Sequence, residues 1–128
     1  MANILIVDDE PPIIMLMKFI LQKAGHVISE ASNGQEAVKA LGIEPPDPAA
    51  TLPDLVVLDI MMPVMDGYTV AVMMKDCPRT SGIPILIVTA KGDMAPMFKP
   101  LPSVAGFFGK PFDPNALRGA IAKLVPPK

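Results

Sequence analysis

Three short apolar runs, each ended by a polar residue, constrain the fold of this chain more than any other feature. They are ILIV at 4–7, LVVL at 55–58 and ILIV at 85–88, and they are followed by Asp8, Asp59 and Thr89. Continuous, β-branched runs of this length are typical of strands buried on both faces of a sheet. A buried helix is the alternative, but the runs are too short for one. Weaker strands are predicted at 27–31 and 105–108.

Between the runs, apolar residues recur at helical spacing. Pro11 and Pro12 suit a first helical turn, and Asn33, Asp66 and Asp113 are of the types that commonly cap a helix start. Strands that alternate with helices indicate a parallel α/β sheet covered on both faces. The helices are predicted at 11–24, 33–41, 66–77 and 113–124.

The composition fits one globular domain. The chain has 128 residues, 51% of them hydrophobic and 19% charged, which suits a single core. A net charge of −2 gives no general attraction to nucleic acid or to an anionic membrane, so neither is expected as a direct partner. The single cysteine, Cys77, excludes an internal disulfide. No apolar stretch approaches the roughly 20 residues of a membrane helix, and residues 1–9 lack the features of a secretory signal. A cytoplasmic protein is therefore expected.

A proline-rich connector, EPPDPAATLPD at 44–54, interrupts the alternation of strands and helices. It could link two domains, but neither flank would then be long enough to fold well alone. We interpret it as an extended loop inside one domain that covers residues 1–125 and is followed by a short tail at 126–128.

The polar residues at the ends of the predicted strands indicate one chemical site. Ligands of an open parallel sheet bind beyond the carboxyl ends of its strands. Oxygen ligands there would favour a hard ion such as Mg²⁺, which would allow a phosphoryl group to approach an aspartate nucleophile. Each residue alone would be interpreted as a cap or a surface side chain, and only their joint position predicts this chemistry. The residues expected to meet are Asp8, Asp9, Asp59, Thr89 and Lys110.

Four motifs resemble those of response-regulator receiver domains of two-component systems. They are ILIVDDE at 4–10, PDLVVLDIMMPVMDG at 53–67, IPILIVTA at 83–90 and GKPF at 109–112. The resemblance covers about residues 3–125. It implies a flavodoxin-like (βα)5 fold, a three-layer sandwich around a parallel five-stranded sheet of order 2-1-3-4-5. It also implies a phosphoprotein of phosphorelay signal transduction, with a sensor histidine kinase or phosphotransfer protein as donor and a downstream protein target that the sequence does not identify.

The resemblance further implies which residues bind the metal and accept the phosphoryl group. Asp59 matches the phospho-acceptor. Asp8 and Asp9 match the acidic pair that, with Asp59, binds Mg²⁺ or another divalent cation such as Mn²⁺. Met61 matches the position whose backbone carbonyl contacts the metal.

Four more positions carry implied roles in phosphoryl binding and switching. Lys110 matches the lysine that neutralises the phosphoryl group, and Pro111 matches a proline that follows a cis peptide bond. Thr89 matches the switch hydroxyl and Phe107 the aromatic switch position. Phe107 has no phenol hydroxyl, so the switch would act through packing alone.

One segment departs from the family pattern. Residues 91–103, KGDMAPMFKPLPS, should hold the fourth of the five helices but contain Pro96, Pro100 and Pro102. Because proline removes a backbone donor and collides with the preceding turn, this helix is predicted to be short, irregular or absent. The partner surface that it commonly forms is therefore altered.

The two alternatives to the phospho-acceptor function are an aspartyl phosphatase and a phosphate-independent adaptor. An aspartyl phosphatase would commonly carry a second acid where Met61 stands and would need a cap domain. A phosphate-independent adaptor would not need the complete set of site residues that this chain has, but the altered segment 91–103 keeps this alternative open. We therefore expect a signalling domain that catalyses only its own phosphorylation and dephosphorylation.

Overall fold

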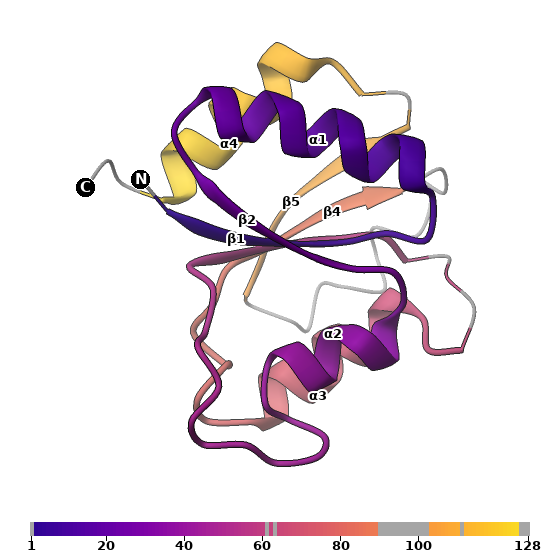
Figure 1. The fold of residues 1–128 in the computed structure, drawn as a ribbon, viewed down its shortest axis with the longest axis vertical. Coiled ribbons are helices and arrows are strands. Elements are labelled where there is room, and N and C mark those ends of the chain that lie inside the picture. Colours follow the sequence, from indigo (N-terminus) through magenta and orange to yellow (C-terminus); the bar gives the residue numbers. More distant parts are fainter. Residues whose placement is uncertain (1, 61, 63, 90–102, 111, 126–128) are drawn as a thin grey trace.

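The computed structural model describes residues 2–60, 62, 64–89, 103–110 and 112–125. The strands are β1 (Asn3–Val7), β2 (Val27–Ala31), β3 (Leu55–Leu58), β4 (Ile85–Thr89) and β5 (Val104–Gly109). They form one parallel sheet of order β2-β1-β3-β4-β5, which confirms the predicted topology (Figure 1). Val7 lies beside Leu58, and Leu58 lies beside Ile87. This register brings the residues that follow β1, β3 and β4 to one edge of the sheet.

Helices cover both faces of the sheet and complete the three layers that were expected. The helices on one face are α1 (Pro11–Lys23) and α4 (Pro114–Leu124), and those on the other are α2 (Gly34–Ala40) and α3 (Gly67–Asp76) (Figure 1). None of these described helices is long and apolar enough to cross a bilayer.

The predicted caps are confirmed. The side chains of Asn33, Asp66 and Asp113 each accept a hydrogen bond from a backbone N–H in the first turn of α2, α3 and α4. Helix α4 is the helix predicted at 113–124. The segment 91–103, where a short, irregular or absent helix was predicted, lies outside the described residues except for Ser103.

Alternate residues of the strands supply two separate cores. Leu5 and Val7 of β1 pack with α2 and α3, whereas Ile4 and Ile6 pack with α1 and α4. Successive side chains of a strand point to opposite faces of its sheet, so a strand that serves two cores must be apolar at every position. All residues of β3 are buried for this reason, which confirms the interpretation of the apolar runs.

Arg79, which lies in the turn after α3, contacts the proline-rich connector. Its guanidinium donates to the carbonyl oxygens of Asp47 at 2.9 Å and Ala50 at 3.0 Å. At the end of the connector, the backbone N–H of Asp54 donates to the carbonyl of Asn3 at 2.7 Å, and the Asp54 carboxylate accepts from the N–H of Asn3 at 2.9 Å. Hydrogen bonds therefore hold the connector at its middle and at the point where it leads into β3.

Candidate functional site

The polar residues that end the strands meet at the carboxyl edge of the sheet, as predicted. Backbone pairing continues one residue past three of the strands. The N–H of Asp8 donates to Ala31 at 3.1 Å, that of Asp59 to Val7 at 2.9 Å, and that of Lys110 to Thr89 at 2.9 Å. These bonds fix the backbone positions from which the side chains of Asp8, Asp59 and Lys110 extend. The register of the strands therefore determines the geometry of the site.

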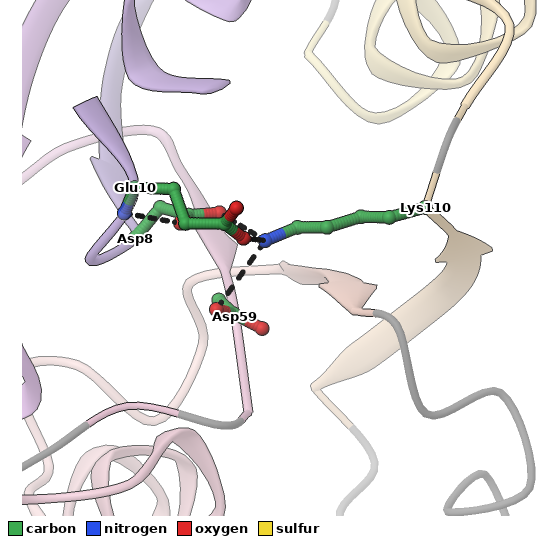
Figure 2. A network of polar contacts seen from close by, with 4 residues as sticks. All are labelled: Asp8, Glu10, Asp59 and Lys110. Atoms are coloured by element: carbon green, nitrogen blue, oxygen red, sulfur yellow. Dashed lines mark hydrogen bonds and ion pairs between the residues drawn. The ribbon is translucent and has the colours of Figure 1, made fainter. Parts of the chain in front are cut away.

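The ammonium group of Lys110 lies among three carboxylates that come from two other strand ends (Figure 2). Its Nζ is 2.9 Å from Asp8 Oδ2, 2.8 Å from Glu10 Oε1 and 3.4 Å from Asp59 Oδ2. The side chains of Asp8 and Asp59 are almost fully buried, at 1% and 4% exposed, whereas that of Glu10 is 56% exposed. The described site is therefore an acidic pocket with one cation at its centre.

Burial and charge shift the pKa values of this pocket. Burial raises the pKa of Asp8 above its ordinary value, although the contacts with Lys110 and with the backbone N–H of Glu10 act in the opposite direction. For Lys110, burial alone would lower the pKa. The bonds to Glu10 and Asp8 and the negative charge of Asp8 and Asp59 outweigh it and raise the pKa above its ordinary value. Lys110 is therefore charged at neutral pH.

The carboxylates have the composition and spacing of a site for a hard divalent cation. One oxygen from each of Asp8, Asp9, Glu10 and Asp59 can be chosen so that all lie within 4.8 Å of one another. Asp8 Oδ2 is buried and accepts no hydrogen bond of good geometry from the described residues, although the Lys110 ammonium lies close to it. An enclosed carboxylate oxygen with a free lone pair fits an oxygen-preferring ion such as Mg²⁺.

Glu10 is the site residue that sequence reasoning missed. The signal was present, because Glu10 is the third acid in the DDE run that follows β1, but its contact with Lys110 spans the chain from one end to the other. Two other expected features cannot be placed, since Met61 and Pro111 lie outside the described residues.

The two residues expected to form a switch lie on neighbouring strands. Thr89 ends β4, is 1% exposed, and pairs with Gly109 of β5. Phe107 pairs with Ile87, two residues before Thr89, and its side chain is 36% exposed. Because residues two apart on a strand share a face, Thr89 and the Phe107 position border the same side of the sheet.

The loop after Asp59 is closed by a tight contact at the start of α3. The N–H of Gly67 donates to the carbonyl of Ile60 at 2.9 Å. A Cβ atom at Gly67 would overlap the carbonyl oxygen of Asp59. Glycine is therefore needed for the chain to return this close to the aspartate.

Comparison with known proteins gives a consistent result. The family described as "Response regulator receiver domain" matches residues 4–122. The DNA-binding dual master transcriptional regulator RpaA of Synechocystis is 33% identical over 126 residues, which are 98% of this chain and 49% of that protein. The regulatory protein PhoP of Bacillus subtilis is 32% identical over 96% of this chain and 48% of its own length. The chain thus spans about half the length of these curated relatives.

Solved structures of the same size share the fold. The chemotaxis protein CheY4 of Vibrio cholerae is 26% identical, with a TM-score of 0.84 over 98% of this chain and 99% of that one. The response regulator TrrA of Thermotoga maritima, solved in complex with Mg²⁺ and BeF, is 32% identical, with a TM-score of 0.80 over 98% of this chain and all of that one.

Proposed function

Because the chain belongs to the response regulator receiver domain family, we propose that it takes a phosphoryl group onto Asp59 and thereby switches its contacts with other proteins. The observation that carries this proposal is the ammonium of Lys110, which reaches from the end of β5 to the buried carboxylates of Asp8 and Asp59. A fixed cation beside a buried carboxylate is what a phosphoryl acceptor requires, since the transferred group brings further negative charge.

In the proposed reaction, a carboxylate oxygen of Asp59 forms a bond to phosphorus while the bond from phosphorus to the donor breaks. With a phosphohistidine donor, the electron pair of the broken bond stays on the imidazole nitrogen. Lys110 neutralises a phosphoryl oxygen, and the hydroxyl of Thr89 donates a hydrogen bond to another. Positioning and charge neutralisation are most of what such a transfer needs from the protein.

Asp8, Asp9 and Asp59, with the backbone carbonyl of Met61, would hold Mg²⁺ or a similar divalent cation such as Mn²⁺. When bound, the cation supplies positive charge that offsets the crowded carboxylates. The oxygen-only donor set supports this assignment, as does Asp8 Oδ2, which accepts no hydrogen bond of good geometry from the described residues.

Phosphorylation would be reported through Thr89 and Phe107 to the surface around β5. The donor is a sensor histidine kinase or a phosphotransfer protein; one structure with 32% identity is described as the receiver domain of a signal transduction histidine kinase. The output is a protein contact, without direct binding to nucleic acid or membrane, in keeping with the net charge of −2. The domain, at residues 1–125, acts in the cytoplasm and catalyses only its own phosphorylation and dephosphorylation.

Intact-mass measurement after treatment with acetyl phosphate and Mg²⁺ tests the proposal. The expected result is one added phosphoryl group that is absent in Asp59→Asn and in the presence of a chelator. Asp76→Asn, which changes an exposed carboxylate at the end of α3, is the matched control and should be modified like the wild type. A folded wild-type protein whose mass does not change would overturn the proposal.

A further inference from the structure

Glu10 has a carboxylate that its own helix does not use. Glu10 is the N-cap residue of α1, with φ −103° and ψ 104°, yet its side chain makes no capping hydrogen bond. An N-cap side chain normally accepts from the second or third N–H of the helix. Here the first two positions are Pro11 and Pro12, which have no N–H. The third N–H, from Ile13, donates to the Glu10 carbonyl at 3.0 Å.

The carboxylate is instead held against Lys110. The N–H of Glu10 donates to Asp8 Oδ1 at 2.9 Å, which fixes the backbone from which the side chain extends. Glu10 Oε1 then lies 2.8 Å from the Lys110 ammonium (Figure 2). The distance from the same ammonium to Asp59 is longer, at 3.4 Å. The cation is thus closer to Asp8 and Glu10 than to the residue that would carry the phosphoryl group.

We propose that Glu10 is a positioning residue that keeps Lys110 closer to Asp8 and Glu10 than to Asp59 in the unphosphorylated protein and competes with the incoming phosphoryl group for the ammonium. This inference rests on the proposed phosphorylation of Asp59. Of the three carboxylates around Lys110, that of Glu10 is the exposed one, so water can solvate it when Lys110 leaves. The buried Asp8 has no such compensation, and Glu10 is therefore the partner that Lys110 gives up.

Two substitutions separate the effect of the charge of Glu10 from the effect of the length of its side chain. Glu10→Gln removes the charge, and Glu10→Asp keeps it but shortens the side chain by one methylene. An ion pair with one exposed partner, as Glu10 is here, changes an equilibrium by about two- to fivefold. We expect both variants to be phosphorylated by acetyl phosphate and Mg²⁺ about two- to fivefold faster than the wild type. The NMR resonances of the Lys110 side chain should shift in both variants before phosphorylation. Glu30→Gln, which removes an exposed charge paired with Lys18, should change neither.

Each other outcome overturns the inference in a distinct way. Equal rates and unshifted Lys110 resonances in all variants would show that Glu10 does not hold the ammonium. A faster Glu10→Gln with an unchanged Glu10→Asp would show that only net charge matters. Slower phosphorylation with weaker Mg²⁺ binding would make Glu10 a metal ligand. If the wild type itself is not phosphorylated on Asp59, the proposed function fails and this inference fails with it; wild-type phosphorylation with unaltered variant rates refutes this inference alone.

Discussion

Substitution of Lys110 by methionine should destabilise the metal-free protein at neutral pH. The change keeps an unbranched side chain but removes the cation at the centre of the pocket. Asp8 and Asp59 are then left buried as carboxylates without their counter-charge. Removal of one partner from a buried ion pair costs about 3–5 kcal/mol. The pair with Glu10, whose carboxylate is largely exposed to water, adds at most about 1 kcal/mol.

The lower end of that range applies here, because Asp8 can reduce the cost of its buried charge by taking up a proton. Burial raises its pKa above the ordinary 3.8 in the folded protein. Ionised Asp8 therefore opposes folding at neutral pH, and this opposition fades as the pH falls through the folded pKa toward 3.8. Loss of Lys110 raises the same pKa further. The expected penalty is about 3 kcal/mol at neutral pH, a fall in Tm of about 10 °C, and it should shrink in acid.

Urea unfolding followed by far-UV circular dichroism, with a chelator present, measures this penalty at about pH 7 and about pH 4.5. The chain has no tryptophan, so circular dichroism is the suitable probe. Lys75→Met is the matched control, because Lys75 is exposed and forms no ion pair within the described residues; it should stay within about 0.5 kcal/mol of the wild type. A Lys110→Met protein as stable as the wild type at about pH 7, or equally penalised at both pH values, would refute the reasoning.

Four further substitutions test the scaffold. Gly67→Ala forces a methyl group against the backbone of the acceptor aspartate and should cost about 1–3 kcal/mol in urea unfolding, whereas Gly82→Ala, which meets open space, should not. Asn33→Ala removes the cap of α2 and should lower the unfolding free energy by about 1 kcal/mol in the same assay. The backbone N–H of Ser32 donates to the Glu36 carboxylate and lowers the pKa of Glu36. The contribution of this carboxylate to stability should therefore be present at neutral pH and lost as the pH falls through its folded pKa. A pH series on Glu36→Gln should show no such loss. Thr80→Val deletes a buried hydroxyl that donates at 2.7 Å to a carbonyl near the end of α3 and should cost about 1–3 kcal/mol in thermal unfolding, with Thr80→Ser close to the wild type.

Most of the fold was predictable because local and tertiary requirements agree in this sequence. A strand that contributes to two cores must be apolar at every position. This holds for residues 4–7, 55–58 and 85–88. The caps Asn33 and Asp66 were predictable since their bonds reach only three residues along the chain. Once the strands run in parallel, the meeting of Asp8, Asp59 and Lys110 follows from topology alone.

Other features depend on contacts that no local pattern specifies. The acid that Lys110 approaches most closely depends on the path of the backbone between β1 and α1. The two prolines at the start of α1 have no N–H to be capped, so the Glu10 side chain is left to contact Lys110. The bonds from Arg79 to the connector join residues about 30 positions apart. Such contacts follow from the path of the backbone, and a pattern of apolar and polar residues carries little information about it.

The charges of the pocket are distributed unequally over the sheet. Its acids follow β1 and β3, which have a strand on each side, whereas its cation follows β5, which pairs only with β4. An edge strand can separate from one neighbour without disturbing the rest of a sheet. Local opening of β5 would therefore withdraw the ammonium and leave the carboxylates in place, so that an edge strand governs the electrostatic balance of the pocket.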